Sequence, residues 1–536
     1  MTDGLGLGDA YSATLLRIKG QGGDKSRLGM DALMWISHSE RPLKADELCH
    51  ALSVEIGSPN FNTDNIPSIS TLIVCCQGLV VVEKEASTVR LIHFTLQEYL
   101  RAQPGLFGAT HSTMADTCLS YLNSQQVKAF STGPPPDLQD TPFLEYSSLY
   151  WGAHAKRDLA ESTKKLAQKL FDDCENRMPA KILLQGRDLY CHAVDFDKIP
   201  LFSSLHYASF FGIVEIVASL VEMEGCDINQ MDFTGSTPLH WAAWNGHTGI
   251  VKTLLGRDGA SPDKPDNHSW TPLRWAAYNG HEGVVKILLG RDDVNPDNPD
   301  NNGRTPFWWA ARNGHEGVVK ILLGRGDVNP NKQDNGGKPP LWWAVYKGHE
   351  GVVKVLLGRD DVNPDNPDNN GRTPLRWAAY KGHEGVVKIL LGRDDVNPSK
   401  PNNHGQTPVW WAARNGHEGV VKVLLGRDDV NPNRPDNIGR TPLWLAACYG
   451  HERVLTMLLP RGFNPDKPNV NGRTPLHLAA RNGQEGVVKI LLGRDDVNPK
   501  KSDKDGKTPL DWATEEGHQG VIALLLPPES VTPSLS

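Results

Sequence analysis

Apolar and polar positions follow one pattern that recurs about every 34 residues through the C-terminal three-fifths of the chain. Residues 271–304 show one copy: a Thr-Pro pair, apolar residues at helical spacing with two alanines, a Gly, a second apolar helix face, and a stretch rich in Asn, Asp, Pro and Gly. Thr is a favoured N-cap, Pro suits the first helical position, and Gly readily ends a helix. Each copy is therefore predicted to form two short helices followed by a turn or hairpin.

The Thr-Pro step marks the copies, and a Pro-Pro pair at residues 339–340 keeps the register where one Thr is missing. Its threonines are Thr237, Thr271, Thr305, Thr373, Thr407, Thr441, Thr474 and Thr508. A degenerate first copy begins at Ser203 and the last copy ends near Leu526, which gives about ten repeats. This period predicts a mostly helical solenoid, in which each copy buries its apolar face against its neighbours.

The sequence of the copies resembles the ankyrin repeat. The T-P-L-x-x-A-A core of that family stands at residues 237–243 and 474–480, and the N-G-H step at residues 279–281 and the V-V-K-x-L-L string after it also match. The resemblance covers about residues 199–527. It implies an array that holds a protein ligand in a concave groove, lined by the first helices and the hairpin tips.

Seven tryptophans share one position of the first helix, which the ankyrin family fills with an aliphatic core residue. They are Trp241, Trp275, Trp309, Trp343, Trp377, Trp411 and Trp512. We expect them to pack in the core with a partnered indole N–H. A histidine also recurs at the start of the second helix, at residues 281, 315, 349, 383 and 417. We expect it to bond to the backbone rather than to bind a metal.

Three positions of the first helix change from copy to copy: the position before the Trp and the two positions before the Gly. The ankyrin resemblance implies that the last two face the groove, and Tyr, Trp and Arg dominate interface hot spots. The candidate partner-binding residues are Trp244, Arg274, Tyr278, Trp308, Arg312, Trp342, Tyr346, Lys347, Arg376, Tyr380, Lys381, Trp410, Arg414, Tyr449 and Arg481. The alternative is a solvated helix face that drifts without selection.

The first two hundred residues are not repetitive and mix helix and strand patterns. Residues 30–37, 45–56 and 66–76 are predicted to form helices, and residues 79–83 and 89–94 the two strands of a hairpin. Three helices with a two-stranded wing make a winged-helix domain. The third helix carries no Lys or Arg, whereas a DNA-reading helix needs basic and amide side chains, so nucleic acid is not an expected partner.

Several strings in this region resemble the winged-helix segment of fungal NACHT proteins of the STAND class, the NOD-like receptors. They are LMWISHSERPLKADELCHAL at residues 33–52, LIVCCQGLVVVE at 72–83 and VRLIHFTLQEYL at 89–100, with connector-like strings at 117–127 and 142–159. Together with the repeats, the resemblance divides the chain into an N-terminal linker helix (1–28), a winged-helix-like domain (29–103), a helical connector (104–198), the repeat array (199–527) and a disordered tail (528–536).

A nucleotide-binding module would need the P-loop pattern G-x-x-x-x-G-K-[ST] after a strand. Residues 20–26, the nearest string, have Asp in place of a Gly, too few residues before the Lys, and no apolar strand in front. The chain therefore resembles the sensing part of a STAND receptor, which implies a role in non-self recognition or cell death and a nucleotide-binding or effector module as a missing partner. It is either a truncated receptor or a stand-alone protein. The alternative function is a cytosolic ankyrin scaffold without switching.

Composition agrees with a soluble cytoplasmic protein. The formal net charge of -7 over 536 residues is modest, which argues against general binding to nucleic acid or anionic membranes. The eight cysteines lack zinc or disulfide-framework spacing, which fits a reducing cytosol. No nucleophile elbow or paired-carboxylate setting stands out, so no enzymatic activity, metal or cofactor is expected.

Overall fold

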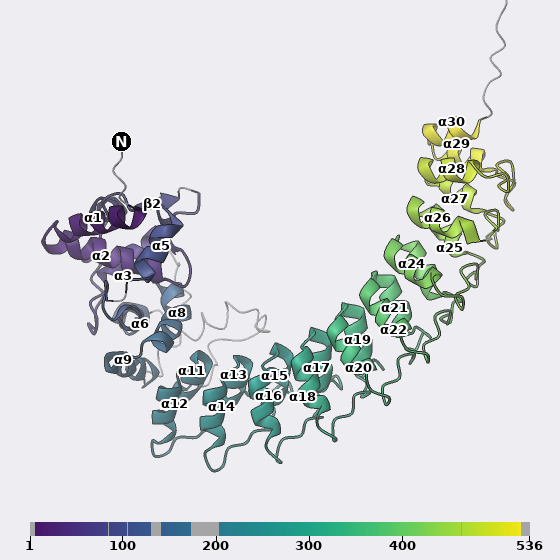
Figure 1. The fold of residues 1–536 in the computed structure, drawn as a ribbon. Helices are drawn as coiled ribbons and strands as arrows, with labels where there is room; N and C mark the ends of the chain where they lie inside the picture. Colours follow the sequence, from purple (N-terminus) through teal and green to yellow (C-terminus); the bar gives the residue numbers. More distant parts are fainter. Residues whose placement is uncertain are drawn as a thin grey trace, which may run out of the picture. The chain divides into compact units, whose positions relative to one another are not determined.

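The computed structural model describes residues 6–526 apart from residues 84, 104, 130–140, 173–202 and 462–463 (Figure 1). The chain forms two compact units, Met1–Pro272 and Leu273–Ser536. The predicted tail at residues 528–536 and the predicted boundary between connector and array at residues 198–199 lie outside the described residues.

The winged-helix elements form in the first unit. They are helices α2 (Gly23–His38), α3 (Ala45–Ser53) and α4 (Ile69–Cys75), a 3-10 helix η1 (Thr63–Asn65), and strands β1 (Leu43–Lys44), β2 (Val80–Glu83) and β3 (Thr88–Leu91). The strands form one antiparallel sheet in the order β1-β3-β2, with Val80 opposite Leu91. Val80 and Val89 face the core whereas Val81 is exposed, as expected for a sheet buried on one face. The predicted three helices and two-stranded wing are confirmed.

A helix, α5 (Phe94–Arg101), begins where the second predicted strand was expected to end. His93 explains the change, because its Nδ1 accepts a hydrogen bond from the backbone N–H of Thr95 (3.2 Å) and thereby caps the helix. Leu96 and Leu100 lie four residues apart and bury one face of α5. The strand pattern at residues 89–94 therefore contained the start of a helix.

The helices that flank the winged helix pack against it and against the first repeat. They are α1 (Leu7–Lys19), α6 (Thr110–Leu122), α7 (Gln125–Ala129), α8 (Leu144–Arg157) and α9 (Glu161–Asp172). Helix α1 lies on α5, where Tyr11 Oη is 2.8 Å from Thr95 Oγ1. A Cβ placed on Gly152 of α8 would lie 2.3 Å from the ring of Phe211 in the first repeat. Gly at this position allows the connector to approach the array closely.

Helix pairs form the repeats, and the described residues contain ten such pairs. The first helices are α11 (Ser204–Phe211), α13 (Pro238–Trp244), α15 (Pro272–Asn279), α17 (Pro306–Asn313), α19 (Pro340–Lys347), α21 (Pro374–Lys381), α23 (Pro408–Arg414), α25 (Pro442–Cys448), α27 (Pro475–Arg481) and α29 (Pro509–Glu515). The second helices are α12 (Val214–Val221), α14 (Thr248–Leu255), α16 (Glu282–Leu289), α18 (Glu316–Leu323), α20 (Glu350–Leu357), α22 (Glu384–Leu391), α24 (Glu418–Leu425), α26 (Glu452–Leu458), continued by η4 (Leu459–Arg461), α28 (Glu485–Leu492) and α30 (Gln519–Leu525). Figure 1 shows the two helices of a pair next to each other, as for α17 and α18. The predicted solenoid is confirmed.

Local sequence sets the ends of these helices. In α17, the Oγ1 of Thr305 accepts a hydrogen bond from the backbone N–H of Trp308 (3.1 Å), and Pro306 occupies the first turn. Gly314 ends the helix at a φ of 82°, a left-handed conformation that Gly adopts without strain. In the hairpin before α17, the Oδ1 of Asp300 accepts hydrogen bonds from the backbone N–H groups of Asn302 and Arg304.

Side chains from most of the repeats bond to the backbone of the repeat before them. The Nε2 of His349, the residue before α20, lies 2.9 Å from the backbone oxygen of Arg312. The same contact is made by His247, His315, His383, His417, His451 and His518. The predicted backbone role of the recurrent histidine is therefore confirmed. No helix in the described part of the chain is long and apolar enough to cross a membrane.

Candidate functional site

The position before the core Trp supplies hydrogen bonds between repeats. Among the described residues, six at this position donate a side-chain N–H to a backbone oxygen in the hairpin of the following repeat: His206 to Ser236 (3.1 Å), His240 to Trp270 (3.0 Å), Arg274 to Arg304 (3.1 Å), Trp410 to Arg440 (3.1 Å), Trp444 to Arg473 (3.0 Å) and His477 to Lys507 (3.2 Å). His, Arg and Trp are interchangeable here because each carries an N–H that reaches the same acceptor. For these residues the variation from copy to copy reflects a shared structural task, whereas the indole N–H groups of Trp308 and Trp342 have no hydrogen-bond partner among the described residues.

Burial corrects part of the predicted binding set. The five candidates at this position are Arg274, Trp308, Trp342, Arg376 and Trp410, with 1%, 1%, 3%, 5% and 1% of their surface exposed. The following repeat covers them, so they cannot offer their side chains to a partner unless the array opens. We therefore remove these five from the residues proposed to contact a ligand.

The tryptophans of the core position are buried or half-buried, as expected. Three of them, Trp241, Trp343 and Trp512, donate their indole N–H to an aspartate nine residues earlier, at 2.8, 3.2 and 3.0 Å. Among the described residues, the indole N–H groups of Trp377 and Trp411 have no hydrogen-bond partner. For Trp377, Asp368 at the equivalent position pairs with an arginine instead, and for Trp411 the aspartate is replaced by Asn. The expected partnered N–H is thus incorrect for these two.

The other candidate residues remain accessible on the first helices. Trp244 is half-buried in the first unit. In the second unit, the accessible candidates are Tyr278, Arg312, Tyr346, Lys347, Tyr380, Lys381, Arg414, Tyr449 and Arg481. We call these nine residues the variable stripe.

The rings and guanidinium groups of the variable stripe rest on the core tryptophans. The guanidinium of Arg312 lies 5.1 Å from the ring centroid of Trp309 and 5.4 Å from that of Trp343. Tyr380 meets Trp411 edge-to-face at 5.1 Å, and Tyr346 meets Trp377 at 5.4 Å.

Such cation–π and edge-to-face contacts hold the side chains in place, so binding would cost little conformational entropy. Lys347, Lys381 and Tyr449 are the most exposed members of the stripe.

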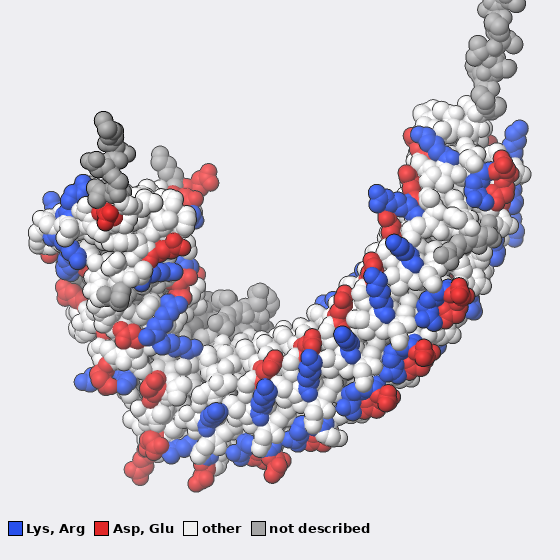
Figure 2. Space-filling model, viewed as in Figure 1, with Lys and Arg blue, Asp and Glu red and all other residues white. Residues whose placement is uncertain are grey.

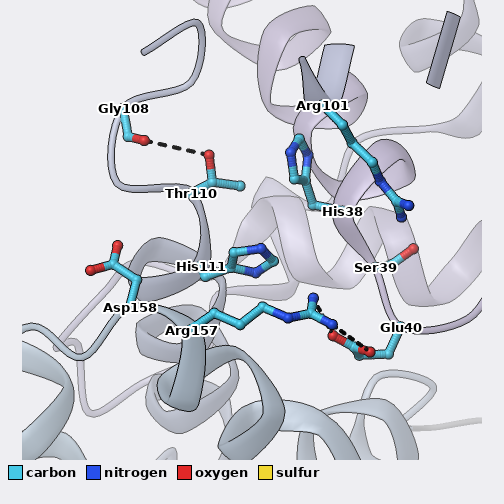
Figure 3. Close-up of a pocket in the computed structure, with 9 residues that line it drawn as sticks. All are labelled: His38, Ser39, Glu40, Arg101, Gly108, Thr110, His111, Arg157 and Asp158. Atoms are coloured by element: carbon cyan, nitrogen blue, oxygen red, sulfur yellow. Dashed lines mark hydrogen bonds and ion pairs between the residues drawn. The ribbon is translucent and has the colours of Figure 1, made fainter. Parts of the chain in front are cut away.

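A second candidate site is a cleft of about 650 Å³ inside the first unit. It is lined by His38, Ser39, Glu40, Arg101, Gly108, Thr110, His111, Arg157 and Asp158. Figure 3 shows the His111 imidazole in the middle of these side chains, above the ion pair in which Arg157 and Glu40 approach to 2.6 Å. Residues from α2, α5, α6 and α8 meet here, so no short sequence motif could have revealed the cleft.

A chain of hydrogen bonds runs from the cleft into the core. The Oη of Tyr146 accepts from the backbone N–H of Glu40 (3.0 Å), which leaves its proton for the Nε2 of His154 (3.0 Å). Nδ1 of His154 then donates to Nδ1 of His111 (3.0 Å). Burial lowers the pKa of His154 to about 3, and the nearby His111 and Arg157 side chains lower it further, while burial likewise lowers the pKa of His111 to about 4. Both imidazoles are therefore neutral at pH 7.

Acid is expected to destabilise the first unit through His154. Its pKa is about 3 in the folded chain and about 6.5 in an unfolded chain, so the unfolded chain takes up the proton first. Stability from this group is complete above pH 6.5 and falls as the pH drops toward 3, with a loss of about 2 kcal/mol at pH 5. Hydrogen exchange of α8 between pH 7 and 5 measures this loss. His154→Gln should flatten the pH dependence, and an unchanged slope would contradict the assignment.

Sequence comparisons agree with the architecture described above. The family model described as Ankyrin repeats (3 copies) matches overlapping segments at residues 180–266, 205–300, 249–334, 292–368, 327–400, 394–469 and 443–533. The chain belongs to the ankyrin repeat family, whose repeats are protein-interaction modules. A model described as GPI inositol-deacylase, winged helix domain, matches residues 18–111. A search of curated proteins found no match to the chain.

Proposed function

We propose that this chain is the non-catalytic sensing part of a fungal STAND (NOD-like) receptor, which binds a protein ligand through the variable stripe in the cytoplasm. The accessible Tyr and Arg side chains that rest on the tryptophan core carry this proposal, and exposed lysines lie beside them on the same helices. Their chemistry is that of interface hot spots, and their rigid support favours binding. The winged-helix match at residues 18–111 supports the receptor context, with non-self recognition or cell-death signalling as the role.

Binding to the stripe can be tested with a random-peptide display library selected against the full chain. The test variant replaces the three most exposed stripe residues together: Lys347→Ala, Lys381→Ala and Tyr449→Ala. The affinity of the selected peptides is expected to fall by at least about tenfold, because hot-spot truncations commonly cost about 1–2 kcal/mol each. The matched control replaces Lys320, Lys354 and Lys388 on the second helices by Ala. Peptides that bind equally well to both variants would contradict the stripe as the binding surface.

The receptor context needs its own test, because a stand-alone ankyrin scaffold would use the same surface. Sequencing of the transcript upstream of the Met1 codon distinguishes the two. A continuous reading frame that encodes a P-loop supports the receptor. A stop codon in frame directly upstream supports the scaffold.

A further inference from the structure

The variable stripe carries positive charge without acidic neighbours in its own two positions. From Tyr278 to Asn482, these two positions of each first helix hold Arg312, Lys347, Lys381, Arg414 and Arg481 and no Asp or Glu. Among the described residues, the first four of these cations form no ion pair, whereas Arg481 pairs with Glu516 at 3.2 Å. The chain as a whole has a formal net charge of -7. The stripe is thus a cationic surface on an acidic protein.

The second helices of the same unit look different. Figure 2 shows blue and red side chains alternating in rows along the array. Lys388 pairs with Glu384 at 2.6 Å, and the same i, i+4 pairing joins Lys320 to Glu316. Positive charge on these two second helices is therefore balanced by a carboxylate one turn away, whereas the charge of Arg312, Lys347, Lys381 and Arg414 in the stripe is not.

A buried cation lies under the middle of the stripe. Arg376 is 5% exposed, and its guanidinium carbon lies 4.2 Å from the ring centroid of Trp377 and 4.3 Å from that of Trp411. Its Nε and Nη1 have no hydrogen-bond partner among the described residues. Burial is the main cause that lowers the pKa of Arg376 to about 10, and the group is still charged at pH 7. Asp368, the one carboxylate that acts on it, already pairs with Arg372 at 2.7 Å.

One substitution between repeats explains this uncompensated charge. Arg274 occupies the same position three repeats before Arg376 and pairs with Asp300, 26 residues later, at 3.4 Å. The residue 26 positions after Arg376 is Asn402. Asn402 keeps the turn, since its Oδ1 accepts from the backbone N–H groups of His404 and Gln406 as Asp300 does in its own hairpin. It provides no negative charge.

We infer that the variable stripe binds an acidic segment of a protein partner, centred on Tyr380, Lys381 and Arg414 above the buried Arg376. This inference rests on the proposed function and names the chemistry of its ligand. Arg376 lies 5.4 Å from the ring centroid of Tyr380, so its field reaches the surface through protein of low dielectric. The exposed parts of Tyr346 and Tyr380 offer contact to apolar side chains between the carboxylates of such a segment. A long nucleic acid would also meet the mixed charges of the second helices, where Glu316 and Glu384 neutralise lysines, which disfavours it.

The first test uses the full chain and three labelled probes: a short peptide of alternating Glu and Phe, its Lys-Phe counterpart and an oligo-dT strand. Only the acidic peptide is expected to bind. Lys347→Glu with Lys381→Glu should weaken that binding by about tenfold or more. The matched control, Lys354→Glu with Lys388→Glu on the second helices, changes the net charge equally and should alter the affinity less than about threefold.

The second test changes the buried charge without altering the stripe surface. Asn402→Asp places a carboxylate 26 residues after Arg376, at the position equivalent to Asp300, which pairs with Arg274. This substitution should raise the thermal midpoint of unfolding, because it neutralises the uncompensated charge of Arg376. For the same reason it should lower the affinity for the acidic peptide by about threefold or more. A higher thermal midpoint with unchanged affinity would show that the charge of Arg376 does not contribute to binding of the peptide.

Three results would overturn the inference. The oligo-dT strand could bind more tightly than the acidic peptide, which would make the stripe a nucleic-acid surface. The control pair on the second helices could weaken binding as much as the stripe pair, which would reduce the effect to net charge. Display selection could yield neutral peptides that depend on Tyr449 but not on Lys347 or Lys381. In that last case the proposed function stands and the acidic ligand does not.

Discussion

Replacing Trp410 with Ala is expected to destabilise the second unit by about 3–5 kcal/mol, the range for large aromatic truncations in cores. Trp410 is 1% exposed, and its indole N–H donates to the backbone oxygen of Arg440 in the next repeat at 3.1 Å. Its ring meets Trp411 edge-to-face at 4.8 Å, and the Arg440 guanidinium lies 5.2 Å from its centroid. Truncation removes all three contacts, and the two with Arg440 join this repeat to the next. Equilibrium unfolding in urea, followed by circular dichroism, measures the change.

Repeat arrays add a second readout, because their stability is roughly a sum of nearest-neighbour terms. Weakening one junction should broaden or split the urea transition as well as shift it. The matched variant is Trp410→His, since His240 makes the same bond to Trp270 at 3.0 Å. It should recover part of the loss by restoring the N–H donor. Equal losses for His and Ala would show that ring volume alone stabilises this junction.

The repeat frame could be predicted from sequence because its signals are local. Thr and Pro cap the first helix, Gly ends it, and the apolar spacing defines the second, so each decision needs only a few neighbouring residues. The winged helix was predicted for the same reason. The end of the second strand of the winged helix was not predicted correctly. His93 caps a helix there, although the residues around it also follow the alternating pattern of a strand.

The binding face was harder to predict, because it depends on contacts between repeats. Arg274 and Tyr278 lie four residues apart on one helix, so spacing alone places them on one face. The hairpin of the next repeat covers only the first of them, through the bond from Arg274 to the oxygen of Arg304. Sequence variation at the two positions therefore looked alike but has different causes. The position of Arg274 varies among side chains that can donate an N–H to the next hairpin. The position of Tyr278 varies on a surface that stays accessible.

The cleft around His111 could not be predicted from sequence, because the residues that form it are far apart in the chain. His38 and His111 lie on different helices, and the buried partner of His111, His154, is contributed by a third. Single histidines without a recognisable spacing carry no signal of their own. Only the packing of the connector against the winged helix brings them together.

The same packing makes Trp35→Ala the second substitution with a large expected effect, a loss of about 3–5 kcal/mol in the first unit. Trp35 of α2 is 2% exposed. Its ring meets Phe143 at 5.5 Å, Tyr146 at 5.9 Å and His154 at 6.4 Å, all edge-to-face, and all three partners belong to the connector. Trp35→Phe keeps an aromatic ring in place and should lose less than half as much.

Hydrogen exchange would show whether winged helix and connector unfold together. If Trp35 joins them into one cooperative body, Trp35→Ala should lower protection in α2 and α8 by the same factor, because both then open in one step. Loss of protection confined to α2 would mean that the connector is stable by itself. An equal loss of protection in α8 would mean that winged helix and connector unfold as one body.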